Sequence, residues 1–245
     1  MKKTVSVLLA AVLLFSLTAC SSAAKTQPAP QQTQESVTET AVPHPAEALE
    51  QEPAVTANVS EESESEILVL FFSRTGEQYN VGVIEKGNTA IVAEMIAESI
   101  GADLYEILPA DDHYPTTYKE LTDAGLQEQR DGARPAYAGE LPDFENYGTI
   151  FIGAPVWWGD WPMIMYTVFE STPLSGKTLI PFSTHAGSGL SGFDRSLAEA
   201  YPECTIAKGL AVAGTDAQNN PDIVRVTVTS WLSELGLLYA KEKDS

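Results

Sequence analysis

The feature that most constrains the fold of this chain is an unbroken apolar run at residues 67–72, Ile-Leu-Val-Leu-Phe-Phe. Six consecutive apolar side chains leave no polar face, which is typical of a parallel β-strand that helices cover on both sides. Ser73, Thr75 and Gly76 follow at once and offer two hydroxyls and a flexible backbone. Open α/β sheets bind ligands where such strands end, so we predict a phosphate-holding loop at these residues.

Strand-like and helix-like segments alternate along the rest of the chain, which predicts a parallel sheet. Strands are expected at residues 67–72, 103–108, 149–154, 178–183 and 205–212. Helices are expected at residues 89–100, after Trp161, and at residues 190–200 and 221–238. Residues 114–139 are polar and punctuated by Gly and Pro, and we expect surface helix and loop there. The predicted architecture is an α/β domain with five strands and helices on both faces of the sheet.

The first twenty residues have the form of a secretory signal. Two lysines precede a mostly apolar segment, residues 5–17, which is too short for a comfortable membrane span. Residues 17–20, Leu-Thr-Ala-Cys, resemble a bacterial lipobox, in which the cysteine is acylated and becomes the new N-terminus. The alternative is an ordinary signal cleaved near Ala19, with Cys20 as an unmodified thiol. We expect lipidation of Cys20 and a membrane-anchored lipoprotein outside the cytoplasm, on the outer face of the cell membrane or on its periplasmic side.

Residues 21–66 are rich in Ala, Pro, Gln, Ser, Thr and Glu and have no periodic apolar pattern, so we expect a disordered acidic tether. The whole chain has a formal charge of −20. Without the two signal lysines, and without the one lysine and nine glutamates of the tether, residues 67–245 carry −14. These residues suffice for one well-buried domain. A domain this acidic is expected to bind basic partners rather than nucleic acid.

Cysteine and histidine residues are too few for a disulfide or a metal centre. Once Cys20 is lipidated only Cys204 remains, and it is interpreted as a small core residue rather than a nucleophile. His113 and His185 lie far apart in the sequence without a cysteine pair nearby, so no metal site is predicted. We interpret His113 as part of a structural turn.

Two further loops follow predicted strands and should emerge at the same edge of the sheet as Ser73. One contains Trp157, Trp158 and Trp161, which fits either a wall for a flat conjugated ring or a core plug or protein interface. The other, residues 184–189, contains small residues that let the backbone approach a ligand but also fill ordinary turns. Asn88 is expected to cap the helix that begins at residue 89.

With these loops in place, the sequence resembles the flavodoxin family, and the resemblance covers nearly all of residues 66–238. Residues 73–76, Ser-Arg-Thr-Gly, with Asn88 and Thr89 are similar to the family's Ser-x-Thr-Gly-Asn-Thr phosphate loop, here split by residues 77–86 and a second glycine. Residues 155–159, Pro-Val-Trp-Trp-Gly, are similar to the first ring-flanking loop of the family, and residues 184–189 to the loop beside the far edge of the ring.

The resemblance implies a flavodoxin-like three-layer fold with strand order 2-1-3-4-5, and FMN as the cofactor. The residues that it implies for cofactor binding are Ser73, Arg74, Thr75, Gly76, Asn88, Thr89, Ala90, Pro155, Val156, Trp157, Trp158, Gly159, Thr184, His185, Ala186, Gly187, Ser188 and Gly189.

Three details of this implied site stay open. Either Trp157 or Trp158 stacks on the flavin ring. The insertion at residues 77–86 folds outward, covers the cofactor or forms a partner surface; a loop of this length costs little extra entropy to close, so we expect the split halves to meet. His185 either makes a local hydrogen bond or, when protonated, offsets the negative charge of the reduced flavin.

The resemblance implies an FMN-binding electron-transfer protein, whose chemistry belongs to the cofactor, so no catalytic residue is assigned. Its expected partner is a redox protein, either soluble or embedded in the membrane. The alternative is an FMN-dependent oxidoreductase that acts on quinones or other small acceptors, because the same fold serves both classes. A third alternative is a flavin-free binding module that uses the tryptophan loop as an interface. An extracytoplasmic location, where no nicotinamide pool is expected, favours the carrier.

Overall fold

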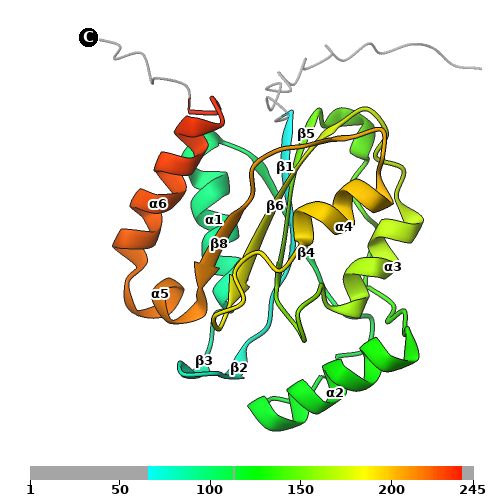
Figure 1. Cartoon of the computed structure of the whole chain (residues 1–245), viewed down its shortest axis with the longest axis vertical. Coiled ribbons are helices and arrows are strands. Elements are labelled where there is room, and N and C mark those ends of the chain that lie inside the picture. Colours follow the sequence, from blue (N-terminus) through cyan, green and yellow to red (C-terminus); the bar gives the residue numbers. More distant parts are fainter. Residues whose placement is uncertain (1–65, 113, 239–245) are drawn as a thin grey trace, which may run out of the picture. The chain divides into compact units, whose positions relative to one another are not determined.

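A parallel sheet forms the centre of the computed structural model, which describes residues 66–112 and 114–238. The strands lie in the order β4 (Asp103–Ile107), β1 (Ile67–Phe72), β5 (Thr149–Pro155), β6 (Thr178–His185) and β7 (Thr205–Ile206), and β8 (Leu210–Ala213) also pairs with β6 (Figure 1). All of these pairs are parallel. When β7 and β8 are counted together as the fifth predicted strand, the order is 2-1-3-4-5, which confirms the predicted fold class.

The strand predicted at residues 205–212 is in fact two short strands. β7 pairs with residues 178–179 of β6, and β8 pairs with residues 182–185 farther along the same strand. β8 thus continues the pairing to the end of β6, at the edge of the sheet where the predicted loops lie.

Helices cover both faces of the sheet, as the alternating pattern predicted (Figure 1). Successive side chains of a strand point to opposite faces, so each buried strand supplies both layers. On one face α1 (Asn88–Ile100), α5 (Gly214–Asn219) and α6 (Pro221–Glu234) pack against Val69, Phe71 and Phe151. On the other face α3 (Met163–Ser171) and α4 (Phe193–Ala200) pack against Leu68, Leu70 and Ile150.

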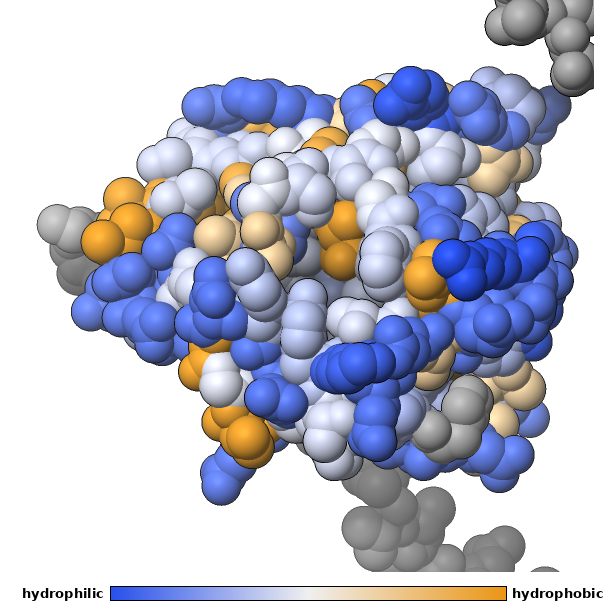
Figure 2. All heavy atoms as spheres, turned by 60° about the horizontal axis from the view of Figure 1, so that its bottom comes forward, coloured by the Kyte–Doolittle hydropathy of each residue, from blue (hydrophilic) through white to orange (hydrophobic). Residues whose placement is uncertain are grey.

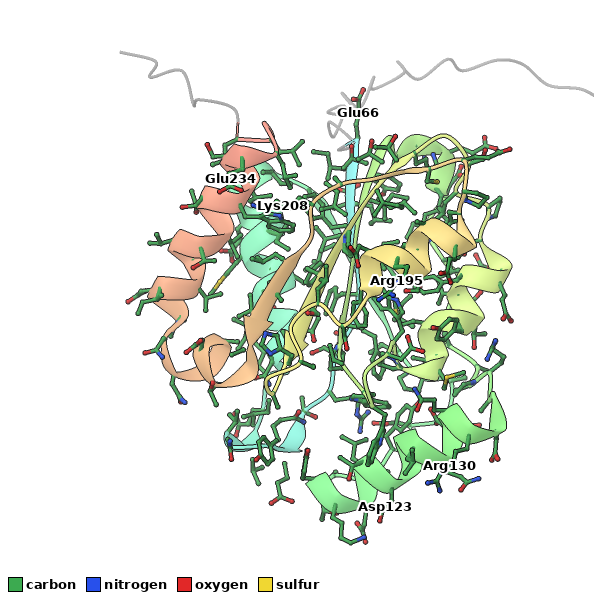
Figure 3. The ribbon with its side chains drawn as sticks, viewed as in Figure 1. Glu66, Asp123, Arg130, Arg195, Lys208 and Glu234 are labelled. Atoms are coloured by element: carbon green, nitrogen blue, oxygen red, sulfur yellow. The ribbon has the colours of Figure 1, made fainter. Side chains whose placement is uncertain are left out.

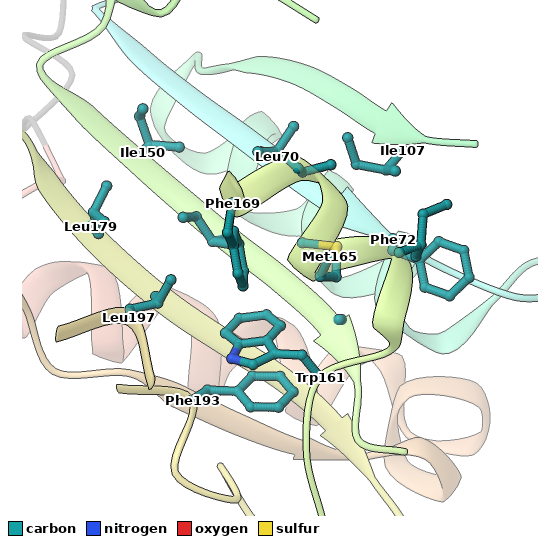
Figure 4. Close-up of a cluster of buried hydrophobic side chains, with 14 of the residues drawn as sticks. Leu70, Phe72, Ile107, Ile150, Trp161, Met165, Phe169, Leu179, Phe193 and Leu197 are labelled. Atoms are coloured by element: carbon teal, nitrogen blue, oxygen red, sulfur yellow. The ribbon is translucent and has the colours of Figure 1, made fainter. Parts of the chain in front are cut away.

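Aliphatic and aromatic side chains together fill the layer beneath α3 and α4 (Figure 4). Trp161 is only 1% exposed and stacks on Phe193, with ring centroids 3.5 Å apart and an interplanar angle of 11°. Its indole Nε1 donates to Ser196 Oγ at 2.6 Å, and its ring meets the edge of Phe169 at 5.3 Å. One tryptophan of the loop is therefore a core residue, which leaves Trp157 and Trp158 for the site.

Two predicted helix boundaries differ from those observed by more than one residue. α4 begins at Phe193 rather than at residue 190, and α6 ends at Glu234 rather than at residue 238. Asn88 is the first residue of α1 and not its cap, since Gly87 occupies the N-cap position. The Asn88 side chain is unavailable for capping because it accepts a hydrogen bond from Gln218 of α5.

An unpredicted hairpin and the surface helix predicted within residues 114–139 lie at the carboxyl edge of the sheet (Figure 1). The insertion forms a hairpin of β2 (Gly76–Gln78) and β3 (Gly82–Ile84), and residues 114–139 contain α2 (Tyr118–Asp131). Elsewhere, a 3₁₀ turn, η1 (Phe144–Asn146), precedes β5.

Cys204 packs against the core, and its thiol donates a hydrogen bond to the carbonyl of Leu174. These contacts fit the interpretation of Cys204 as a small core residue.

The described residues contain no helix with the length and apolar character needed to cross a membrane. The predicted signal, the lipidation site Cys20, the tether up to residue 65 and His113 lie outside the described residues.

Candidate functional site

A cavity of about 240 Å³ opens at the carboxyl edge of the sheet, lined by the second and third predicted loops and by Asn88 from the second half of the first. Figure 2 brings this edge of the molecule forward and shows mainly hydrophilic residues on it, with small hydrophobic patches between them. The predicted residues that line the cavity are Asn88, Pro155, Val156, Trp157, Trp158, Thr184, His185 and Ala186. The lining residues that the sequence did not indicate are Gln78, Tyr79, Tyr118, Leu121, Thr122, Gly125 and Gly214.

The two halves of the split first loop meet, as expected. Ser73 Oγ accepts a hydrogen bond from the Ala90 backbone N–H at 3.1 Å. Gly87 lies directly on the first half, because a Cβ atom there would come within 2.1 Å of Ser73 Oγ and 2.7 Å of the Arg74 carbonyl oxygen. The start of α1 is therefore held against the end of β1, although a hairpin separates them in the sequence. A helix start directs backbone N–H groups and a positive dipole outward, which suits an anion.

Hydroxyl groups connect the first loop to the third. Thr89 Oγ1 and Thr184 Oγ1 lie 2.7 Å apart, and both side chains are buried. Ser183 Oγ donates to the Gly189 carbonyl at 3.0 Å, which holds residues 184–189 in a closed turn. The third loop is thus fixed by its own hydrogen bond and by the first turn of α1.

Arg74 points away from the cavity. Its Nη1 donates to Asp112 Oδ1 at 2.6 Å and its Nη2 to the Tyr114 carbonyl at 3.2 Å. The guanidinium also lies 5.2 Å from the centroid of the Tyr114 ring, and the side chain is only 10% exposed. The Arg74 side chain therefore does not line the cavity, although the resemblance implies it as a phosphate ligand. Its contacts hold the first loop to Asp112 and Tyr114 instead.

Other implied residues do not line the cavity. Thr75 lines a separate hollow of about 320 Å³ near Glu85 and Glu106, and Gly76 lies against the carbonyl oxygen of Thr116. The remaining implied residues outside the lining are Ser73, Thr89, Ala90, Gly159, Gly187, Ser188 and Gly189.

The two remaining tryptophans of the second loop differ in environment. Trp157 is half-buried under α2, where it meets Phe72 and Tyr114 edge to face at centroid distances of 5.7 and 5.3 Å. A Cβ atom on Gly125 would be 3.1 Å from its ring, so only glycine lets α2 lie this close without displacement. Trp158 is 53% exposed, and its indole Nε1 donates to the Thr122 carbonyl at 2.7 Å.

A tight turn presents Trp158 at the cavity. The backbones of Trp157 and Asp160 exchange hydrogen bonds of 2.9 and 3.0 Å, and the two residues between them have φ values of +52° (Trp158) and +82° (Gly159). Two positive φ values are those of a type I′ turn, which glycine adopts without strain at the second position. Gly159 therefore shapes the loop even though its own atoms do not line the cavity.

The hairpin and α2 close the outer side of the cavity. The Glu77 backbone N–H donates to the Thr116 carbonyl, and Glu77 Oε2 accepts from the Tyr118 backbone N–H, both at 2.8 Å. The rings of Tyr79 and Tyr118 lie 5.5 Å apart. Figure 3 shows Asp123 and Arg130 on α2, at the same end of the domain. Of the three alternatives for the insertion, the structure favours the one in which it covers the cavity.

His185 lines the cavity. Its Nδ1 accepts a hydrogen bond from the Gly187 backbone N–H at 2.9 Å, as the first interpretation of this residue proposed. Burial lowers the pKa of His185 below its usual 6.5, although the nearby Asp216 carboxylate opposes the shift. Both observations favour the local hydrogen bond over a protonated imidazole.

The lowered pKa of His185 predicts a pH-dependent stability. Just below pH 6.5 the folded protein binds fewer protons at this residue than the unfolded chain, so its free energy of unfolding falls as the pH falls. Urea unfolding of the flavin-free protein at about pH 7.5 and about pH 5.5 measures this loss. His185→Asn keeps an acceptor near the Nδ1 position and should show a smaller loss. Equal losses in the two proteins would contradict the assignment.

The chemistry of the lining fits FMN. No Asp, Glu, Lys or Arg side chain is among the described residues that line the cavity. Instead, four aromatic rings, those of Tyr79, Tyr118, Trp157 and Trp158, provide walls for a flat conjugated ring. Asn88 and Thr184 provide hydrogen-bonding groups at the side of the cavity next to the start of α1.

Comparisons with known proteins agree with this geometry. The sequence model of the family described as Flavodoxin matches residues 78–232. A solved structure of a flavoprotein candidate from Bacteroides uniformis ATCC 8492 has 32% identity, covers 68% of this chain and 97% of its own, and gives a TM-score of 0.55. Another, from Bacteroides eggerthii DSM 20697, has 29% identity, covers 69% and 97%, and gives a TM-score of 0.54.

No curated protein matches the chain. The family match nevertheless extends over more than half of the sequence and includes α1 and the second and third loops. The chain therefore belongs to the flavodoxin family and has a flavodoxin-like FMN-binding domain.

Proposed function

We propose that this protein is an electron carrier that binds FMN and is anchored outside the cytoplasm. The observation that carries the proposal is the lining of the cavity, which has aromatic walls and hydrogen-bonding groups but no charged side chain among the described residues. Such a lining suits the flavin and offers no Lys or Arg for the phosphates of a nicotinamide substrate. When bound, FMN supplies the redox chemistry, while the protein sets its environment and the access of partners.

We assign the phosphate of FMN to the split first loop. Ser73 and the first turn of α1 supply a hydroxyl and backbone N–H groups, and Asn88 adds a side-chain amide at the cavity. The ring is assigned to the side of the cavity formed by the second loop. Trp158 is the better stacking partner, because the ring of Trp157 is already packed against Phe72 and Tyr114.

The proposed location and partner rest on the sequence. Lipidation of Cys20 would hold the protein at the membrane, and residues 21–66 would let the domain reach a redox partner there, including a membrane-embedded one. The charge of −14 on residues 67–245 would draw a basic partner surface toward the domain.

Membrane fractionation of the wild-type protein and of the Cys20→Ser variant tests the anchor. The anchor is refuted if both proteins sediment with membranes equally.

One observation favours the second candidate, an FMN-dependent oxidoreductase for quinones or other small acceptors. The hairpin and α2 place Tyr79 and Tyr118 at the outer side of the cavity, where they would also border an aromatic substrate. A carrier needs only an accessible ring edge, whereas an enzyme needs a bounded substrate pocket.

Turnover measurements distinguish the two functions. We expect the FMN-loaded protein to accept electrons stoichiometrically from a low-potential donor and to oxidise NAD(P)H with a quinone no faster than free FMN does. Rapid steady-state oxidation would replace the carrier proposal by the oxidoreductase. A colourless protein that takes up no FMN would refute both and support a flavin-free binding module.

A further inference from the structure

Gln218 on α5 joins the second half of the split first loop to the rest of the domain. In an uninterrupted phosphate loop the peptide chain itself would hold Asn88 next to Gly76. Here the chain leaves at Gly76, forms the β2–β3 hairpin and returns only at Gly87. The returning end therefore needs contacts from elsewhere in the fold to hold it in place.

Gln218 provides two of these contacts from more than 100 residues away in the sequence. Its Nε2 donates to the Lys86 carbonyl at 2.8 Å and to Asn88 Oδ1 at 2.9 Å. One amide nitrogen thus spans the last residue of the insertion and the first residue of α1. Because both of its hydrogens are used, the orientation of the Gln218 side chain is determined.

The hydrogen bond to Asn88 also determines what this residue offers to the cavity. Its Oδ1 accepts a hydrogen bond from Gln218, and Nδ2 donates to none of the residues that the structure describes, so Nδ2 is the donor left for a ligand. Gly214 makes room for that nitrogen, since a Cβ atom there would come within 2.5 Å of Nδ2. Asn88 lines the cavity at the start of α1, so it presents N–H groups where the helix dipole is positive.

We propose that Gln218 is a positioning residue for the phosphate group of FMN. It holds the returning end of the loop so that the Asn88 amide and the first turn of α1 donate to the phosphate oxygens. The inference rests on the assignment of the phosphate to the split loop under the proposed function, and it adds α5, which lies outside the three loops indicated by the sequence. It holds for a carrier and for an enzyme alike.

The proposal distinguishes between side chains at position 218. Glutamate has the shape of glutamine, but as a carboxylate it donates neither hydrogen bond and adds negative charge near the phosphate. Methionine has a similar length and no charge, but no donor. We therefore expect FMN affinity to fall in the order Gln, Met, Glu.

The test compares FMN with riboflavin, which has the same ring but no phosphate. Flavin fluorescence quenching on the full mature chain gives the Kd of each ligand. For Gln218→Met we expect FMN to bind about tenfold to hundredfold more weakly, the effect of about one hydrogen bond to a charged group, and riboflavin to change by less than about twofold. Gln218→Ala should give the same selective loss. Asn219→Ala, at the exposed next position of α5, is the matched control and should leave both Kd values unchanged.

Three outcomes would overturn the inference or its basis. If Gln218→Met leaves the Kd of FMN unchanged while Asn88→Ala weakens it, Gln218 has no positioning role but the phosphate assignment stands. If Gln218→Met weakens FMN and riboflavin equally, Gln218 only supports the fold. If Asn88→Ala does not weaken FMN relative to riboflavin, the phosphate assignment itself is wrong.

Discussion

The replacement Gly87→Ala is expected to weaken FMN binding by more than about 100-fold. A Cβ atom at this position would lie 2.1 Å from Ser73 Oγ and 2.7 Å from the Arg74 carbonyl oxygen. Two of the three nearest atoms belong to the backbone, so no side-chain rotation can relieve the overlap. The two halves of the loop must therefore move apart, and the hydrogen bond from the Ala90 N–H to Ser73 Oγ is lost.

This separation affects the phosphate more than any other part of the ligand. Hydrogen bonds to a charged group contribute about 1.5–3 kcal/mol each, and the displaced segment contains several of the proposed donors. The Kd of FMN, again compared with that of riboflavin, measures the effect.

Gly148→Ala is the control, because nothing lies within 4 Å of a Cβ atom at Gly148. It should bind FMN as the wild-type protein does. A Gly87→Ala variant with the affinity of the control would show that the close approach of the two halves is not needed for binding.

The replacement Trp161→Ala is expected to lower the free energy of unfolding by about 3–5 kcal/mol. Trp161 is 1% exposed, stacks on Phe193 and donates to Ser196 Oγ, so the variant loses buried area, an aromatic pair and a hydrogen bond together. In a domain of this size such a loss lowers the Tm by roughly 6–20 °C. Urea and thermal unfolding of the flavin-free protein measure both quantities.

Trp158→Ala is the matched comparison from the same loop. Trp158 is 53% exposed and makes one hydrogen bond to the Thr122 carbonyl, so its removal should cost no more than about 1.5 kcal/mol of stability. It should, however, weaken both FMN and riboflavin, because the proposed contact is with the ring. Equal destabilisation by the two variants would contradict the division of the loop into a core tryptophan and a ligand-facing one.

The elements that the sequence predicted well are those with strong local signals. β1 is a six-residue apolar run, and α1 repeats apolar residues at helical spacing, so each matches its predicted range within a residue. The parallel sheet follows from the alternation of such segments, because parallel strands need helical crossovers.

The elements that the sequence missed have weak local signals or depend on distant neighbours. β2 and β3 are three residues each, too short for a periodic pattern. The strand predicted at residues 205–212 is divided because β6 pairs with β7 and with β8 at different positions along its length. Asn88 is a good capping residue by type, but its side chain is engaged by Gln218 in the folded protein.

The sequence by itself determined the fold class, the family and the loops that follow the strands at the carboxyl edge of the sheet, because these depend on local patterns and on motifs. Only the tertiary structure decided that Trp161 belongs to the core, that Arg74 turns away, and that the hairpin and α2 cover the cavity. It also brought Gln218 to the split loop. These outcomes depend on contacts between residues far apart in the chain, and the energy of such contacts arises only when the fold brings their atoms within a few ångströms.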